Sequence, residues 1–401
     1  MSLSAPSTYA PGRVGLLLYA SVVAAFINMY LTQAILPALA RDFGVSPSTA
    51  SLTVSVLIFG IAVSSLLIGP LSDRVGRKPL LAGCALLLTV PSLLCAAAPS
   101  LPLLVLGRAL QGVLIPGLTA VSVAYIAEEF APERVGLWLG GYISANVLGG
   151  LLSRVLSGFL ADTVAPEFGG WRLAFVLGAV LTFGLGLALL RLRPSMHFTP
   201  TLGAKGSYAG MLEHLRTPRL VGGFTVGFAL FFAFTAVFTY LPFHLQAPPF
   251  SFSQTAIGLI YLVYIAGIVS SPLSSLLATR LSQRSVMIAG LGVVLLGNFG
   301  TLVERPVPLI LALLLLCFGN FAAQGAATAF VATQAQHTRG GASSLYLAFY
   351  YVGGSLGAFV PGLLLPLLGW AGVLVCTTLA LLLGMGAAAL LCKPALQVLN
   401  G

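Results

Sequence analysis

The stretch Gly69-Pro70-Leu71-Ser72-Asp73-Arg74-Val75-Gly76-Arg77-Lys78 decides the fold of this chain. It places charged residues between two long apolar runs, residues 48–71 and 79–97. Gly69 lets two helices approach closely, and Gly76 permits a tight turn because glycine has no Cβ. The carboxylate of Asp73 suits the positively polarised N-terminus of another helix. We therefore predict a charged turn that joins two membrane helices at one end of a bundle.

The composition around this turn excludes a water-soluble fold. Of 401 residues, 58% are hydrophobic and only 7% are charged, with a mean hydropathy of +1.03, whereas soluble domains carry about 25% charged residues. The net charge of +10 is spread over the ends of apolar runs, so no nucleic-acid surface is expected. The cysteines lie in or beside apolar runs without metal-ligand spacing, which indicates packing residues and no metal site.

The apolar runs predict an all-α integral membrane protein, because each run is long enough to cross a bilayer as a helix. We expect an N-terminal six-helix bundle over 1–192 that includes a short cytoplasmic tail, a central cytoplasmic linker over 193–218, and a C-terminal six-helix bundle over 219–401. The expected helices are 14–38, 48–71, 79–97, 103–126, 136–160, 171–192, 219–245, 254–279, 286–303, 308–333, 343–366 and 370–391.

The basic residues predict the orientation, since Lys and Arg accumulate in short cytoplasmic loops. With both termini in the cytoplasm, only Arg41, Arg172 and Arg305 fall on the outer side. We therefore expect a multi-pass protein of the inner (cytoplasmic) membrane. The basic residues on the inner side are Arg13, Arg74, Arg77, Lys78, Arg134, Arg191, Arg193, Lys205, Arg216, Arg219, Arg280, Arg284, Arg339 and Lys393.

The two halves carry matching short patterns, as a parallel duplication of a six-helix unit would leave. Leu71 to Val75 resembles Leu277 to Leu281, each after the second helix of its half. Three further matches occur in the same order: Gly107 with Gln111-Gly112 and Gly319 with Gln324-Gly325; Gly149-Gly150 with Gly158 and Gly353-Gly354 with Gly362; Gly170-Trp171 and Gly369-Trp370.

The stretch 69–78 matches the loop pattern GxLxDRxGRK of the major facilitator superfamily at every fixed position, so the chain resembles those transporters. This resemblance implies twelve transmembrane helices in two pseudo-symmetric bundles that expose one site alternately to each side. It also implies a conformational latch, in which Asp73 meets the start of the helix at Gly340-Gly341-Ala342-Ser343 and Arg77 meets Glu128 or Glu129. The latch residues are Gly69, Asp73, Arg74, Gly76, Arg77, Lys78, Glu128 and Glu129.

Two further segments narrow the resemblance. Arg108-Ala109-Leu110-Gln111-Gly112 is similar to the arginine motif in the fourth helix of the family. In the fifth helix, Ala145-Asn146 stands where drug antiporters have Gly-Pro, which weakens a specific drug-antiporter assignment. The run from Tyr142 to Arg154 and the run from Tyr240 to Gln246 are similar to the YnfM and arabinose-efflux (AraJ-like) branch of the drug:proton antiporter group.

Two arginines fall inside predicted helices, where a charge costs roughly 2.5 to 3.5 kcal/mol and marks a pathway or a paired structural site. Arg108, Arg154, Gln33 and Tyr240 lie at comparable depth and could face one cavity. Alternatively, the arginines bind carbonyls and amides that fasten helices together. The substrate-binding candidates are Asn28, Gln33, Arg108, Gln111, Tyr142, Asn146, Arg154, Tyr240, Asn320, Gln324 and Tyr350.

No Asp or Glu falls inside a predicted helix core, although pumps for lipophilic cations usually need a buried carboxylate. An anionic or neutral polar substrate therefore suits the site better than a cation. His244 titrates in a useful range and is a candidate proton carrier within the bilayer. Asp73 and the Glu128-Glu129 pair are the alternatives, since a proton could couple to the latch.

These observations favour a monomeric secondary transporter in the lipid bilayer, with proton-coupled efflux of a small organic compound as the leading function. A facilitator or importer of an organic anion that uses Arg108 and Arg154 is the alternative. The chain has no Walker sequence and no Rossmann loop, so neither a cofactor nor direct ATP drive is expected. A membrane enzyme would need a cluster of catalytic groups, and a membrane receptor normally carries a signalling domain; neither is visible, and we expect no enzyme activity.

Overall fold

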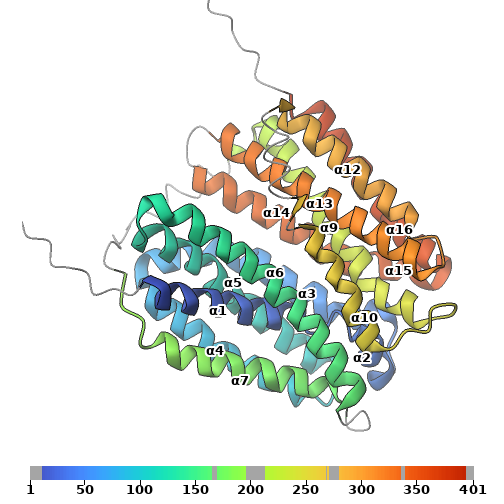
Figure 1. The fold of residues 1–401 in the computed structure, drawn as a ribbon, viewed down its shortest axis with the longest axis horizontal. Coiled ribbons are helices and arrows are strands. Elements are labelled where there is room, and N and C mark those ends of the chain that lie inside the picture. The colour runs from blue at the N-terminus through green and yellow to red at the C-terminus, as the bar shows by residue number, and fades with distance from the viewer. Residues whose placement is uncertain are drawn as a thin grey trace, which may run out of the picture.

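The first half of the protein is a bundle of helices (Figure 1). The computed structural model describes residues 11–164, 169–195, 213–267, 269–270, 280–335 and 339–393. Long helices follow one another through short turns. In the first half they are α1 (Pro11–Tyr30), α2 (Leu36–Phe43), α3 (Pro47–Val75), α4 (Arg77–Ala96), α5 (Leu101–Glu129), α6 (Pro132–Thr163) and α7 (Trp171–Leu189).

The second half repeats this plan. Its helices are α9 (Pro218–Gln246), α10 (Gln254–Ile260), the 3₁₀ helix η2 (Tyr261–Ile265), α12 (Gln283–Gly300), α13 (Pro306–Gln334), α14 (Arg339–Phe359), α15 (Pro361–Leu368) and α16 (Trp370–Leu390). Within the described ranges no strand is present, so the predicted all-α class is confirmed.

Ten helices in the described part of the chain are long and apolar enough to cross a membrane. The described residues also contain a shorter apolar helix formed by α10 and η2, and α12 with 18 residues, so the described part agrees with a twelve-helix plan. Part of the predicted helix 254–279 lies outside the described residues, as does most of the expected linker 193–218. Many large apolar side chains point outward, such as Val180, Leu296 and Leu390, which suits a surface covered by lipid.

Two predicted helices are interrupted. The helix expected over 14–38 ends at Tyr30 and resumes as α2 after a turn over residues 31–35. Pro37 stands in the first turn of α2, where its missing N–H breaks the preceding ladder of hydrogen bonds. The helix expected over 343–366 likewise divides at Val360, because Pro361 begins α15.

The duplicated glycines pack equivalent helices together. Gly149 lies against the backbone of Val23, so α6 approaches α1 closely, and Gly353 lies against the backbone of Phe228, so α14 approaches α9 in the same way. In each case a Cβ would overlap the neighbouring helix. The pairing confirms that these repeated glycines mark equivalent positions in the two halves.

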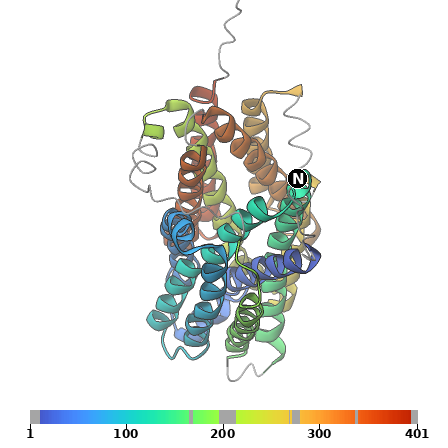
Figure 2. The same cartoon turned by 90° about the vertical axis from the view of Figure 1, so that its left-hand side faces the viewer.

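The protein has two ends that we name by their elements. The motif face holds the turn at Gly76 and the beginnings of α1, α6 and α14. The α2 face holds α2 and the beginning of α10. Figure 1 shows the two bundles converging at the α2 face and diverging toward the motif face. Figure 2 shows the second half above the first when viewed from the diverging side.

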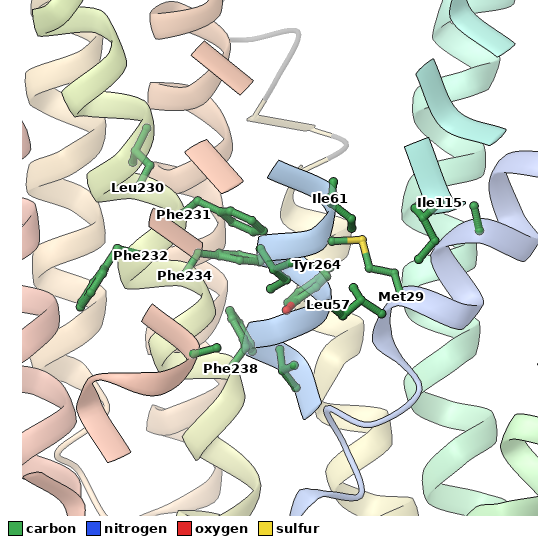
Figure 3. Packing of buried hydrophobic residues seen from close by; sticks show 14 of the residues in the cluster. Met29, Leu57, Ile61, Ile115, Leu230, Phe231, Phe232, Phe234, Phe238 and Tyr264 are labelled. Atoms are coloured by element: carbon green, nitrogen blue, oxygen red, sulfur yellow. The ribbon is translucent and has the colours of Figure 1, made fainter. Parts of the chain in front are cut away.

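The two halves bind each other near the α2 face. The hydrogen bonds between them in the described residues join Gln33 to Thr239, Ser51 to Tyr240, Ser55 to Ser355, Arg154 to Tyr264, and Asp162 to Thr255. Figure 3 shows Leu57 and Ile61 of α3 between the aromatic side chains of α9 and Ile115 of α5. This interface holds one face of the molecule together and positions the site described next.

Candidate substrate site

Arg154 lies in the last third of α6 and has no exposed surface. Its Nε donates to the side-chain oxygen of Gln33 at 2.9 Å, and one Nη donates to the same oxygen at 2.5 Å. The other Nη donates to the carbonyl of Gly150, one turn earlier in α6. The guanidinium is therefore held by neutral oxygens from its own helix and from the turn after α1.

Aromatic rings enclose the guanidinium. Its central carbon lies 3.9 Å from the ring centroid of Tyr30, 4.8 Å from that of Tyr261 and 4.7 Å from that of Tyr264. Tyr261 and Tyr264 are three residues apart in η2, and side chains at this spacing align along a 3₁₀ helix. Ring faces attract cations, so this cage stabilises the charge where water is excluded.

The Arg154 cluster bridges the two halves. Tyr264 belongs to the second half, and its hydroxyl accepts a hydrogen bond from Arg154 at 3.3 Å. The amide of Gln33 donates to the hydroxyl of Thr239, also in the second half, at 3.4 Å. The contacts around Arg154 therefore depend on the relative position of the two halves. A group whose contacts all lie within one half would not have this property.

Among the described residues, no carboxylate pairs with Arg154. Throughout the described residues, the ion pairs are those that Arg77 makes with Asp73 and Glu128. A buried charge is costly unless it is paired, and here carbonyl, amide, phenol and ring groups replace the counter-ion. This arrangement leaves an electropositive site that an anionic group could complement.

Arg108 has a different environment, which favours the structural alternative for this residue. It is fully buried inside the first half, where it donates to the carbonyls of Asn28, Met29 and Thr53 at 2.6 to 2.9 Å. Because α1 ends at Tyr30, the carbonyls of Asn28 and Met29 lack their usual helical partners, and Arg108 satisfies them. Arg108 therefore fastens the broken end of α1.

Asn28 and Gln111 belong to the same structural network. Gln111 accepts from Arg108 at 2.7 Å, and its amide donates to Ser92 at 2.8 Å and to Asn28 at 3.3 Å. Neither bonds to Arg154. The two arginines therefore have separate hydrogen-bond partners in the described residues: the helix break separates Gln33, which binds Arg154, from the carbonyls that bind Arg108.

Tyr240 fastens the halves rather than facing a site. Its hydroxyl donates to the carbonyl of Ala358 at 2.6 Å and lies 3.0 Å from the hydroxyl of Ser51. The side chain has no exposed surface. Tyr240 thus joins α9 and α14 to α3 at the α2 face, which corrects its expected position beside Arg154.

Candidates from the second half lie on facing sides of α13 and α14. The ring of Tyr350 stacks on Phe231 with centroids 4.1 Å apart, and its side chain interacts with Gln324. Asn320, one turn from Gln324, is 1% exposed, and neither atom of its amide has a hydrogen-bond partner in the described part of the chain. Such an unsatisfied buried amide needs a water or a ligand.

Tyr142 and Asn146 lie one turn apart in α6 and interact with each other. The side-chain oxygen of Asn146 is buried and has no partner within the described residues. Both residues stand on the motif-face side of Arg154 along the same helix. They extend a polar surface from Arg154 toward the face where the halves diverge.

His244 lies apart from Arg154, near the α2-face end of α9. Its ring stacks on Trp370 with centroids 4.6 Å apart and packs edge-on against Phe250. Both neighbours belong to the second half. The structure gives His244 a packing role in one half and no contact with the Arg154 cluster.

The motif-face network resembles the expected latch in part. Gly76 adopts a φ of 94°, which only glycine takes readily, so the predicted tight turn is present. Arg77 donates to both oxygens of Glu128 and pairs with Asp73 at 2.7 Å, and Glu129 accepts from Ser195 at 2.6 Å. Arg74 is exposed and Lys78 is half-buried.

Two details of the expected latch differ. Asp73 pairs within its own half instead of reaching the start of α14, where Ser343 is exposed. Gly69 is also exposed, and nothing lies within 4 Å of the place where a Cβ would stand. The reason is that the halves diverge at this face, so the helices that these residues would contact are not beside them.

Sequence reasoning missed Tyr30, Thr239 and Asp162. Tyr30 stands three residues before Gln33, but the helix predicted there concealed the turn that brings both to Arg154. Thr239 adjoins Tyr240, and the sequence favoured Tyr240 as the site residue of this pair. Asp162 lies just beyond the predicted helix 136–160, where an acid has no evident partner in the sequence, yet its carboxylate accepts from the backbone N–H of Thr255 at 2.7 Å and from the Thr255 hydroxyl at 2.8 Å.

Comparisons with known proteins agree with this architecture. Residues 18–259 and 247–399 match the family model described as Major Facilitator Superfamily. The chain is 35% identical over 365 residues to the inner membrane transport protein YnfM of Escherichia coli (strain K12), an alignment that covers 90% of this chain and 86% of YnfM. It is 33% identical over 364 residues to the uncharacterized MFS-type transporter YybF of Bacillus subtilis (strain 168), covering 90% and 88%.

The fold is also similar to solved structures. Superposition on a D-xylose-proton symporter gives a TM-score of 0.78 over 96% of this chain and 98% of the other, at 17% sequence identity. At that identity the likeness concerns the fold alone. The arrangement of two helical bundles therefore has a known structural precedent.

Proposed function

Because the chain belongs to the Major Facilitator Superfamily, we propose that it exports a small organic compound by alternating access, coupled to inward movement of protons. The relatives that match it over most of their length are membrane transporters. The proposed cargo, direction and coupling rest on the structure of the Arg154 cluster together with the divergence of the halves.

The observation that carries the proposal is that one buried cation is held by groups from both halves. Gln33 and Tyr30 come from the first half, and Tyr261 and Tyr264 come from the second. A solute bound here contacts both bundles. Binding energy that differs between two relative positions of the bundles is what shifts such an equilibrium.

The described conformation has its bundles bound at the α2 face and apart at the motif face. In the opposite conformation, the carboxylate of Asp73 would be released from Arg77 to meet the N-terminal end of α14. The latch residues Gly69, Asp73, Arg74, Gly76, Arg77, Lys78, Glu128 and Glu129 would then hold the motif face. Asp73 is thus a candidate for proton coupling, because protonation removes the charge that favours a helix N-terminus.

The substrate contacts that we propose centre on Arg154 and Gln33. Tyr142 and Asn146 of α6 and Asn320, Gln324 and Tyr350 of the second half would contact the rest of the solute. We propose His244 as the second candidate for proton coupling, which it would exert through its stacking contact with Trp370. Arg108, Asn28, Gln111 and Tyr240 would act indirectly, by fastening the helices that carry the site.

A second function is favoured by a specific observation, since Arg154 lacks a carboxylate partner in the described residues. A facilitator or importer of an organic anion would use the same cation without proton exchange. The two functions share the site and differ in their driving force. A solved structure of similar fold is named a D-xylose-proton symporter, so uptake together with a proton is a further possibility for this fold.

We further propose that the chain works as a monomer in the cytoplasmic membrane with the motif face inside. The relative YnfM is an inner membrane protein by name. Basic residues gather on the motif face, where the rule of positively charged inner loops places the cytoplasm. Each half has its own substrate contacts in one chain, so alternating access requires no second copy.

Flux through proteoliposomes tests the function. Vesicles loaded with a candidate compound are diluted to impose a pH gradient in either direction, and efflux is followed with and without an ionophore that collapses the gradient. Proton-coupled export predicts faster efflux when protons move opposite to the compound, and loss of that gain with the ionophore. Flux that is indifferent to pH contradicts proton coupling and supports the facilitator.

A further inference from the structure

We infer that Gln33 occupies the place of a substrate carboxylate, and that the cargo is a small organic anion with a flat ring. This inference rests on the proposed transport function and adds the class of substrate. The side-chain oxygen of Gln33 accepts from Nε and from one Nη of Arg154. These two N–H groups lie on the edge of a guanidinium that carboxylates bind with two parallel hydrogen bonds.

A carboxylate binds this edge more strongly than an amide does. The amide brings one neutral oxygen, whereas a carboxylate brings a negative charge and two oxygens that can accept two parallel hydrogen bonds from the guanidinium. Arg154 is fully buried and unpaired with any acid in the described part of the chain, so the arriving charge meets no competitor. The site therefore selects anions over neutral or cationic analogues.

The side chain of Gln33 can move away from Arg154 when a substrate binds. It stands in the turn over residues 31–35 and not in a helix, so its side chain can move without unwinding α1 or α2. Its second interaction, the 3.4 Å hydrogen bond from its amide to the Thr239 hydroxyl, is long and weak. When a substrate displaces Gln33, this hydrogen bond between the halves breaks. Substrate binding therefore favours opening of the α2 face.

The remainder of the cargo follows from what surrounds the cation. Tyr30 packs on Arg154, and Tyr350 of the second half has its ring stacked parallel to that of Phe231. Flat rings with parallel neighbours accommodate a further flat ring at low cost. The anion is accordingly expected to carry an aromatic or other planar ring.

Two buried side chains without hydrogen-bond partners indicate that the substrate ring carries a polar group. Asn320 and Thr235 are 1% and 2% exposed, and their side-chain polar atoms lack partners within the described residues. Each adjoins a ring, Phe321 or Phe234, that packs near Tyr264 of the Arg154 cage. A hydroxyl or similar group on the ring would satisfy one of them, because buried polar groups are normally hydrogen-bonded.

Equilibrium binding to the purified full chain in detergent tests this inference without any gradient. The probes are 4-hydroxybenzoate, 4-hydroxybenzamide and 4-hydroxybenzylamine, which share one ring and differ in charge. The thermal unfolding midpoint is measured against the concentration of each. We expect the benzoate to raise the midpoint and to bind at least about tenfold more tightly than the other two, as 1.4 kcal/mol from one charge-assisted contact would give.

Variants locate the effect. Arg154→Gln should abolish stabilisation by the benzoate, and Arg41→Gln, the same change at an exposed arginine of the α2 face, should leave it intact. Gln33→Glu keeps the fold testable if Arg154→Gln unfolds, because it supplies a permanent carboxylate. This variant should unfold at a higher temperature than wild type without any ligand and should no longer respond to the benzoate.

Three results would overturn the inference: no stabilisation by the benzoate, equal stabilisation by the amide, or a lowered midpoint in Gln33→Glu. The first two results would show that Arg154 does not select carboxylates. The third would show that a carboxylate beside Arg154 does not stabilise the protein. None of them bears on proton-coupled flux of a neutral compound. Conversely, indifference of flux to pH would leave carboxylate binding untouched, so the two failures are distinguishable.

Discussion

The carboxylate of Asp162, at the end of α6, binds the first turn of α10 in the other half through the backbone N–H and the hydroxyl of Thr255, at 2.7 and 2.8 Å. A carboxylate on the N-terminal N–H groups of a helix is favourable through both hydrogen bonding and charge. The contact that the family resemblance predicts for Asp73 has the same chemistry at the opposite face. One acid from the first half would therefore hold each face in turn.

Replacing Asp162 with Ala should loosen the α2 face. A lost cap of this kind costs about 0.5–2 kcal/mol, enough to change the ratio of two conformations several-fold. The measurement is the labelling rate of a cysteine at Ser55, which is buried where the halves meet, in a chain without its native cysteines. The rate should rise in Asp162→Ala.

The matched control is Asp42→Ala. Asp42 is also an acid of the α2 face, but it accepts from the indole of Trp171 within the first half. Its loss should leave labelling at Ser55 unchanged. Equal rates in wild type and Asp162→Ala would mean that Asp162 does not hold the halves together.

Gly158 and Gly362 are matched positions of the internal repeat, and each touches the other half. Gly158 of α6 lies against the backbone of Gln254, and Gly362 of α15 lies against Ser48. Leucine at either position should drive the halves apart at the α2 face, because a Cβ already overlaps the neighbour. Labelling at Ser55 should increase in both variants. Gly136→Leu, in α6 where nothing lies within 4 Å, should behave as wild type.

Arg108→Gln should destabilise the protein. It leaves the carbonyls of Asn28 and Met29 without partners, and each unsatisfied buried group costs about 1–3 kcal/mol. The thermal unfolding midpoint in detergent should fall clearly below that of Arg41→Gln, whose arginine is exposed. A midpoint equal to that of the control would show that Arg108 does not fasten the end of α1.

Glu128→Gln should weaken the motif-face network. Arg77 is 8% exposed and donates to both oxygens of Glu128, so the loss of charge removes the strongest of its hydrogen bonds. A double-mutant cycle with Arg77→Gln should give a coupling of about 1–2 kcal/mol in unfolding experiments. Glu133→Gln, an exposed acid in the first turn of α6, is the control. A coupling near zero for the Arg77–Glu128 pair would contradict the network.

Much of the fold could be predicted from the sequence, because physical constraints on membrane helices are simple. Each span needs about 20 apolar residues, and the repeated glycines mark where backbones touch. The turn at Gly76 followed from the charged stretch between α3 and α4, whereas the contact of Arg77 with Glu128 is one of the two contacts that the family resemblance implied. The breaks before α2 and α15 were not predicted, because Pro37 and Pro361 stand inside apolar runs that are long enough to cross a membrane as single helices.

The site was less accessible to sequence reasoning, because Arg108 and Arg154 look alike in a linear sequence. Both are single cations in apolar helices at comparable depth. Their roles separate only when the end of α1 is known, since the free carbonyls at that end bind Arg108 and the turn beyond carries Gln33 to Arg154. Tyr240 was misplaced for a similar reason: its hydroxyl is used between helices that are far apart in the chain.

The most direct test of the account measures distances between spin labels at both faces in lipid nanodiscs. One pair stands at Glu133 and Ser343 on the motif face, and the other at Arg41 and Val303 on the α2 face; all four side chains are exposed. Alternating access predicts that Gly158→Leu shortens the motif-face distance and lengthens the α2-face distance together, while Gly136→Leu changes neither. If Gly158→Leu moves only one pair, or moves both pairs in the same direction, the two halves do not exchange their closed faces and the account is wrong.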